Sequence, residues 1–311
     1  MGLLSSGLCY NSSKAHSFRR GYMQSIRING QDRLPLDTPM ILHWYGRLPL
    51  LSYQLFAAHP NVGNVVSTRL GGVSQGAYTS LNLALSSFDA AEHVLENRRL
   101  LCEAVGVALE TLTVGQLVQG VRITVVNEPL RGRGALDRTT VLPATDGLVT
   151  NLLDTPLLMP VADCAAVSFF DPVQQVVAIA HAGWRGVAGK IAVRMIAVMQ
   201  DTFGCNPHDI LVGISPNLGK HDLQVRDDVV ATYQQSFGDQ TRLFFTLQMD
   251  GSFLLDMNAA LLLQLKECGI RQDHVEVAGI TTARTDLFYS HRMEKGKTGR
   301  FAGLIVLRSK Q

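Results

Sequence analysis

The chain has 311 residues, of which 46% are hydrophobic and 17% charged, and its net charge is only +2. This composition is ordinary for a folded protein with a substantial core, and so small a charge argues against nucleic acid or an anionic membrane as partner. There is no membrane-spanning apolar run and no signal-peptide core, and the five cysteines are widely spaced without a C-x-x-C motif, so we expect a cytoplasmic monomer or small homo-oligomer.

The N-terminal part of the chain contains the first predicted elements. Residues 1–35 are rich in Ser, Asn, Arg and Gly without a sustained period, which predicts a loose tail. A strand is predicted in "VGNVVSTR", and residues 90–106 show the apolar spacing of a helix that Gly106 can end. We expect one folded domain over residues 60–309.

Apolar strands dominate the middle of the chain. "VRITVV" predicts one strand, and "LLMPVA", "AAVSFF" and "VVAIA" predict three more, the last two joined by the short turn "DPVQQ". From Val187 the period becomes helical, and Gly204 can end that helix.

The C-terminal part mixes both element types. It contains the predicted strand "ILVGI", helices around 225–237 and 257–268, and the closing strands "VEVAGI" and "AGLIVL". Strands and helices do not alternate strictly, as they would in a doubly wound parallel fold. The sequence therefore predicts an α+β protein, a single domain of mixed β-sheets flanked by helices.

One cysteine and one histidine lie at the ends of the central hairpin. Cys164 precedes its first strand and His181 follows its second, so antiparallel pairing brings them together. They could form a nucleophile–base pair, or two of the three protein ligands of an open zinc site. Asp163 could take part in acid–base chemistry or orient a neighbour. Either Cys164 or His181 alone would more often be structural than functional.

The segment after the histidine favours an anion. "HAGWRG" leads into a predicted helix, whose first backbone N–H groups attract negative charge. Arg185 adds a cation, and Gly183 and Gly186 allow the backbone to approach a ligand closely. We therefore expect a phosphate or carboxylate beside the Cys164–His181 pair.

Taken together, these motifs resemble the YfiH-type laccase-domain family. "ADCAAVSFFDP…VVAIAHAGWRG" carries the resemblance, and "TRLGGVS", "ATDGLVT" and "DLFYSHRMEKGKTGRFAGLI" follow the family order. The family is also known as polyphenol oxidase, purine nucleoside phosphorylase or peptidoglycan editing factor. The resemblance implies mixed sheets flanked by helices, in agreement with the fold expected from the pattern.

The resemblance also implies an activity. It indicates a zinc-dependent purine nucleoside phosphorylase that converts adenosine, guanosine, inosine or methylthioadenosine and phosphate to the base and ribose 1-phosphate, with adenosine deaminase side activity. It implies Cys164 and His181 as metal ligands and catalytic residues, and Arg69 as a phosphate-binding arginine at the active site. Copper oxidase chemistry is less favoured, because the nine histidines show no H-x-H pairing.

The third metal ligand of the family is missing. Where the family has the histidine of a Q-V-H-G segment, this chain has Gln119 in "LVQG". An amide oxygen is a weaker zinc ligand than a neutral imidazole. Two alternatives to an active zinc enzyme therefore stay open: a catalytically weakened member that binds a nucleoside or peptidoglycan precursor, and a metal-free cysteine hydrolase.

Overall fold

The N-terminal unit contains a β-hairpin. The computed structural model describes residues 24–28 and 31–309, and the chain divides into two compact units, residues 1–36 and 37–311. In the first, β1 (Gln24–Ile28) pairs antiparallel with β2 (Gln31–Leu36). The prediction of a loose tail over residues 1–35 therefore does not hold for residues 24–28 and 31–35, whereas residues 1–23, 29 and 30 lie outside the described part.

The second unit starts earlier than the predicted boundary at residue 60, because two strands before that point belong to its first sheet. Leu50 and Leu51 of β4 pair with Ser67 and Val66 of β5. In spatial order this six-stranded sheet consists of β3 (Ile41–Tyr45), β4 (Leu48–Ser52), β5 (Val62–Ser67), β17 (Phe301–Leu307), β9 (Leu157–Val161) and β6 (Thr113–Val114).

The second six-stranded sheet contains the central hairpin. Its two inner strands are buried along their whole length, which explains why they are continuous apolar runs rather than alternating ones. In spatial order the sheet consists of β16 (Val275–Val277), β12 (Leu211–Ile214), β10 (Ala165–Asp171), β11 (Val176–Ala182), β8 (Gly147–Thr150) and β7 (Ile123–Val125). A separate small sheet has the order β13 (Gln224–Val225), β15 (Phe253–Leu255), β14 (Phe245–Leu247).

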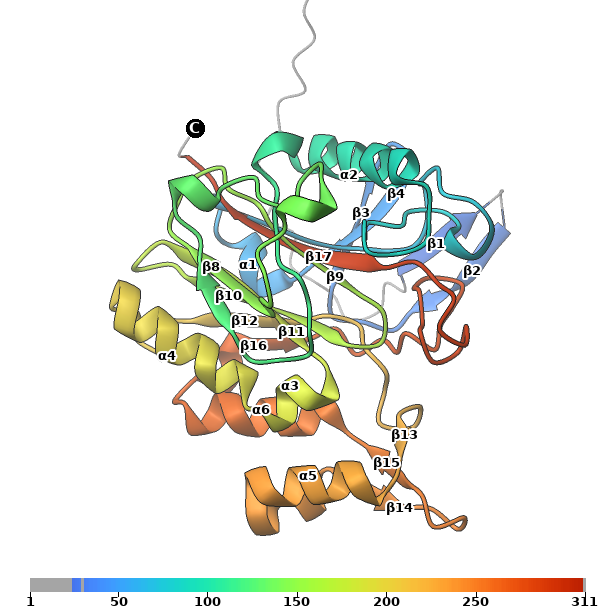
Figure 1. Ribbon diagram of the computed structural model, residues 1–311, viewed down its shortest axis with the longest axis vertical. Helices are drawn as coiled ribbons and strands as arrows, with labels where there is room; N and C mark the ends of the chain where they lie inside the picture. Colours follow the sequence, from blue (N-terminus) through green and yellow to red (C-terminus); the bar gives the residue numbers. More distant parts are fainter. Residues whose placement is uncertain (1–23, 29–30, 310–311) are drawn as a thin grey trace, which may run out of the picture. The chain divides into compact units, whose positions relative to one another are not determined.

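The two large sheets pack face to face, with helices on their outer faces (Figure 1). A Cβ on Gly303 of β17 would lie 3.0 Å from the Ala166 side chain of β10, so a small residue is needed where the sheets meet. Helix α2 covers the first sheet, and α4 and α6 cover the second. Parallel and antiparallel pairs occur in both sheets, so the predicted α+β class with mixed sheets is confirmed.

The helices of the described residues follow the sequence pattern closely, with one exception. Gly106 ends α2 in the left-handed region, at φ 74°. The helix predicted from Val187 is instead two helices, because Lys190 takes a left-handed φ of 61° between them. None of these helices is long and apolar enough to cross a membrane. They are α1 (Gln54–Ala57), α2 (Ala91–Val105), α3 (Trp184–Ala188), α4 (Ile191–Phe203), α5 (Asp227–Phe237) and α6 (Met257–Glu267).

A buried carboxyl group in β16 provides a stability prediction away from the site. Burial raises the pKa of Glu276 above its usual value of 4.5, and the amides of Leu55 and Gln54 oppose the shift only in part. Ionisation therefore destabilises the folded state, and the free energy of unfolding falls as pH rises through the raised pKa. We expect Glu276→Gln to raise the Tm by about 2–4 °C at pH 7 and by less at pH 4, where the native side chain is protonated.

Thermal unfolding by circular dichroism at the two pH values measures this effect. Glu110→Gln, at an exposed position, is the control and should leave the Tm unchanged at both. A lower Tm for Glu276→Gln at pH 7 would show that the ionised carboxylate stabilises the fold.

Candidate functional site

The central hairpin brings Cys164 and His181 together. In the β10–β11 register, Ala165 pairs with Ala182 and Ala166 with His181, so Cys164 lies one step beyond the last pair. The thiol is partly buried and lies close to the imidazole, which is 6% exposed: a Cβ added to Gly183 would be 3.0 Å from Cys164 Sγ and 3.7 Å from His181 Nε2. The proximity expected from the sequence is therefore present, although His181 lies within β11 (Val176–Ala182) rather than after it.

A third residue, Asp146, orients the histidine from the far side. Its carboxylate accepts a hydrogen bond from His181 Nδ1 at 2.8 Å, and its main-chain oxygen accepts one from the His181 amide at 2.7 Å. Asp146 is fully buried. An imidazole whose Nδ1–H is bound to a carboxylate presents Nε2 to the site in a fixed orientation.

The same carboxylate also organises the loop before β7. Its two oxygens accept hydrogen bonds from the amides of Val118, Gln119 and Gly120 at 2.9–3.2 Å. Although burial opposes ionisation, the bonds from His181 and these amides hold the pKa of Asp146 below its usual value. Asp146 therefore links the histidine to the loop that carries Gln119.

Opposing effects act on the histidine itself. Burial alone would lower the pKa of His181, but the neighbouring Cys164 and the Asp146 carboxylate together raise it to about 9. Such a group, in contact with a thiol and backed by a carboxylate, can exchange a proton with a bound reactant.

Gln119 points toward an arginine. Its Oε1 accepts a hydrogen bond from Arg185 Nη1 at 3.1 Å, and the Arg185 guanidinium lies 4.1 Å from the centre of the Trp184 ring. Gln119 has a left-handed φ of 57°. The amide oxygen of Gln119, at the position where the resemblance implies a third metal ligand, is thus hydrogen-bonded to the Arg185 cation. This positive charge opposes the binding of a metal ion at the same oxygen.

These donors do not fit the metal site that the family implies. In the described part of the chain, no group of three or more His, Cys, Asp or Glu side chains is arranged to hold a metal ion. Cys164 and His181 supply two ligands, and Gln119 supplies only an amide oxygen already bonded to Arg185. We therefore derive no step through zinc or copper, and the zinc and copper sites stay predictions.

Asp163, next to the cysteine, is bound on all sides by protein groups. Its Oδ1 accepts from the hydroxyls of Thr282 and Ser290, at 2.8 and 2.6 Å, and its Oδ2 accepts from the Arg292 amide at 2.6 Å. It is 8% exposed and has a left-handed φ of 80°. This arrangement suits the orienting role considered for Asp163, because it holds the loop after β16 beside Cys164.

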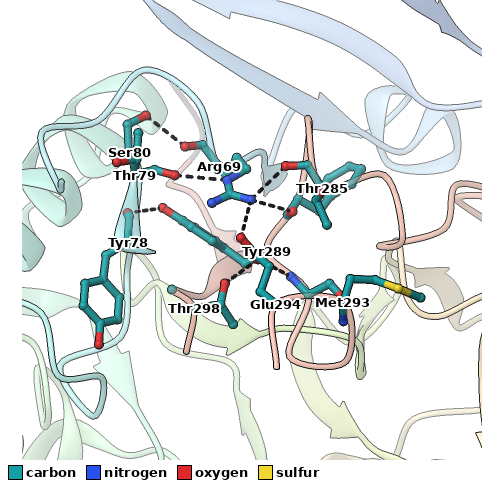
Figure 2. A network of polar contacts seen from close by, with 12 residues as sticks. Arg69, Tyr78, Thr79, Ser80, Thr285, Tyr289, Met293, Glu294 and Thr298 are labelled. Carbon is teal, nitrogen blue, oxygen red and sulfur yellow. Dashed lines mark hydrogen bonds and ion pairs between the residues drawn. The ribbon is translucent and has the colours of Figure 1, made fainter. Parts of the chain in front are cut away.

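The structure does not bring Arg69 together with the other predicted residues. Figure 2 shows its guanidinium between two loops, donating to the carbonyls of Thr79 and Thr285 and to Glu294 Oε1 at 3.0 Å. It also lies 4.4 Å from the centre of the Tyr289 ring. In this position Arg69 fastens the two loops, and its phosphate-binding role stays a prediction.

The two predicted glycines lie where α3 approaches the site. A Cβ on Gly183 would be 3.0 Å from Cys164 Sγ, and one on Gly186 would be 3.2 Å from the carbonyl oxygen of His181. A side chain at either position would push α3 away from the pair, so glycine allows the close approach expected there.

A cavity of about 640 Å³ opens beside the pair. Apolar side chains form part of its wall, including Trp184, Leu218 and Met257. Its lining contains five arginine side chains and a single carboxylate, that of Asp163. The polar and charged lining residues are Ser86, Arg98, Gln116, Gln119, Arg138, Asp163, Cys164, His181, Arg185, His291, Arg292 and Arg300.

Two important residues were missed at the sequence level. Asp146 lies in "ATDG", and Arg300 lies in "TGRFAG". Both segments contributed to the family resemblance, but no role was predicted for either charged residue. Neither is close in sequence to Cys164 or His181. Only the pairing of β8 with β11 brings Asp146 into contact with His181, and only the pairing of β17 with β9 places Arg300 at the cavity.

A family model described as "Multi-copper polyphenol oxidoreductase laccase" matches residues 63–308. The chain belongs to this family. The recognised family relationship is therefore confirmed. The name of the family mentions copper, but the side chains at this site that could bind a metal remain Cys164, His181 and Gln119, as described above.

Relatives in the laccase family carry a different functional name. The chain is 36% identical over 251 residues to "Purine nucleoside phosphorylase YlmD" of Geobacillus stearothermophilus, covering 80% of this chain and 92% of that protein. It is 32% identical to the protein of the same name in Bacillus subtilis, covering 78% and 87%. The coarse prediction of an enzyme related to purine nucleoside phosphorylases is thus supported.

Solved structures of the laccase family confirm the fold. The crystal structure of YlmD from G. stearothermophilus superposes with a TM-score of 0.82 at 33% identity, covering 87% of this chain and all of that one. That of the Bacillus licheniformis hypothetical protein YfiH gives 0.80 at 32% identity, covering 88% and 98%. The predicted YfiH-type architecture is therefore correct.

Proposed function

We propose that this protein is a purine nucleoside phosphorylase with adenosine deaminase side activity. The observation that carries the proposal is the Cys164–His181–Asp146 arrangement beside a cavity lined by five arginines. Arginines suit the phosphate that phosphorolysis consumes, and an apolar wall with Trp184 suits a flat purine. The names of the relatives support the same activity.

The reaction assigns separate tasks to these groups. An oxygen of hydrogen phosphate attacks C1′ of the ribose, the bond from C1′ to the purine nitrogen breaks, and the departing base takes up a proton. The Cys164–His181 pair is placed to exchange that proton, and Asp146 fixes the imidazole so that it does not have to reorient during the reaction. The arginines stabilise the negative charge of the phosphate, both when it binds and as it attacks C1′.

Deamination uses the same pair with water in place of phosphate. Water adds to C6 of adenosine, the amino group leaves as ammonia, and inosine results. The pair again exchanges the proton, which makes the two activities compatible with one site.

Base release is the direct test of the proposal. Purified protein should release hypoxanthine from inosine in phosphate buffer and almost none in phosphate-free buffer of the same ionic strength. It should also convert adenosine to inosine without phosphate. Release that is equally fast in both buffers would indicate hydrolysis and overturn the phosphorylase assignment.

A second candidate function rests on Gln119. The bond from Arg185 to its Oε1 favours a weakened member that binds a nucleoside or peptidoglycan precursor without efficient turnover, because a family metal ligand is replaced. This candidate predicts little zinc in the purified protein. It also predicts that restoring the histidine restores a metal.

Gln119→His is expected to raise the zinc content from well below one ion per chain to near one, and to raise the rate of base release about 10-fold or more. Metal analysis by mass spectrometry, alongside inosine phosphorolysis, measures both quantities. Gln116→His is the control, since Gln116 also lines the cavity, and it should change neither. Unchanged zinc and rate in Gln119→His would remove the support for the second candidate.

A further inference from the structure

Two arginines in the cavity lining, Arg98 buried and Arg300 partly buried, have no carboxylate partner among the described residues. Arg98 is 2% exposed and donates to the main-chain oxygens of Leu83, Gly134 and Ala135, at 2.6–2.9 Å. Arg300 is partly buried and donates to the carbonyls of Thr298 and Gly299. Among the described residues, neither forms an ion pair. A buried cation that bonds only to neutral carbonyls keeps an uncompensated charge.

Both arginines are hydrogen-bonded to the segment around Leu83, Arg98 through its side chain and Arg300 through its main chain. Arg98 Nε donates to the Leu83 carbonyl, and the Leu83 amide donates to the main-chain oxygen of Arg300. Both arginines line the cavity, together with Ser86 from the same segment. Two guanidinium groups therefore line the same part of the cavity. Arg98 comes from α2, and Arg300 comes from the loop directly before β17.

Burial has a measurable consequence for both groups. It lowers the pKa of Arg98 to about 10 and lowers the pKa of Arg300 below its usual value. Arg300 lines the same cavity as Cys164 and His181, and the nearby Cys164 and Asp163 oppose the lowering of its pKa. Asp163 is not its partner, because that carboxylate accepts from Thr282, Ser290 and the Arg292 amide.

The other cavity arginines are more exposed. Arg138, Arg185 and Arg292 are all solvent-exposed, and Arg185 already bonds to Gln119. Water screens an anion at an exposed arginine, whereas the same ion beside a buried guanidinium interacts more strongly. A doubly charged tetrahedral anion would therefore gain most at the buried end.

We propose that Arg300, supported by Arg98, forms the binding site for the attacking phosphate. This inference rests on the proposed phosphorylase function and assigns its phosphate to the buried end of the cavity, beside Cys164. The Arg300 guanidinium holds the anion, while Arg98 adds positive charge from behind the Leu83 segment. Arg69 then acts only by fastening the loops that it bridges.

The position of the anion can be tested on the native protein without an activity assay. Crystals of the full chain are soaked in arsenate, a tetrahedral analogue of phosphate, and its anomalous scattering locates the arsenic atom. The proposal expects an arsenate within hydrogen-bonding distance of the Arg300 guanidinium. An arsenate found only at Arg185 or Arg69, or no bound arsenate at a concentration that supports turnover, would overturn it.

Kinetics of matched variants provides the second test. Arg300→Lys keeps the charge but loses the planar fork, so its KM for phosphate should rise about 10-fold or more, while its KM for inosine stays within about 2-fold. The control is Arg308→Lys, because Arg308 flanks the other end of β17 and also donates to a carbonyl, that of Val105. Equal changes in both KM values, or no change for phosphate, would contradict the site.

The two proposals fail in different ways. If arsenate binds at Arg300 and no phosphorolysis occurs, the anion site stands and the proposed function falls. If phosphorolysis occurs with arsenate at another arginine, the function stands and this site is wrong. Should Arg300→Lys not fold, as judged by circular dichroism, the arsenate position alone decides.

Discussion

Replacing Cys164 with alanine is expected to lower kcat/KM for inosine phosphorolysis by about 10³-fold or more, because the thiol lies beside His181 in the lining of the cavity. The fold should persist, since Cys164 is only partly buried and precedes β10 rather than lying within it. Steady-state base release and thermal unfolding measure the two effects.

Cys268→Ala is the matched control for this experiment. Cys268 is another partly buried, free cysteine, and it lies at the end of α6 outside the cavity lining. It should retain full activity. Comparable activity in both variants would show that the thiol at residue 164 has no catalytic role.

The second large effect is expected at Asp146. In Asp146→Asn one carboxylate oxygen becomes an NH₂ group, which cannot accept hydrogen bonds. The side chain then loses either the bonds from His181 and Gln119, which Oδ1 accepts, or those from Val118 and Gly120, which Oδ2 accepts. The imidazole then loses its fixed orientation or the loop moves, and we expect kcat/KM to fall by about 10²-fold or more. Nuclear magnetic resonance of the His181 ring reports the orientation separately from the rate.

Asp171→Asn controls for a general loss of stability. Asp171 ends β10 at the far side of the same hairpin, where its Oδ1 accepts from the amides of Val173 and Gln174. This variant should lose stability and keep its kcat/KM. If Asp146→Asn changes only the Tm and leaves both the rate and the His181 signals intact, Asp146 is merely structural.

Local patterns were sufficient to predict much of the fold. The continuous apolar runs of β10 and β11 indicated strands buried on both faces, and Gly106 and Gly204 indicated the ends of α2 and α4. Such signals depend on neighbouring residues and on a fixed period. They also placed Cys164 beside His181, because a hairpin register depends only on the two strands and their turn.

Features that depend on distant contacts were not predictable in the same way. The break between α3 and α4 lies at Lys190, with a left-handed φ of 61°, next to Gly189, which packs so closely on Val121 of another segment that a Cβ there would lie 2.6 Å from the Val121 side chain. Asp146 reaches His181 only through the pairing of β8 with β11. The partial burial of Arg300 likewise depends on the pairing of β17 with strands from distant parts of the chain rather than on its neighbours in sequence.

The central claim is that the cavity beside Cys164 and His181 transfers a ribosyl group to phosphate. The most direct measurement is ³¹P nuclear magnetic resonance of the reaction with inosine, with hypoxanthine quantified in the same sample. Our account predicts ribose 1-phosphate and hypoxanthine in equal amounts, both absent with Cys164→Ala. Free ribose in place of ribose 1-phosphate, or no turnover at all by the native chain, would contradict it.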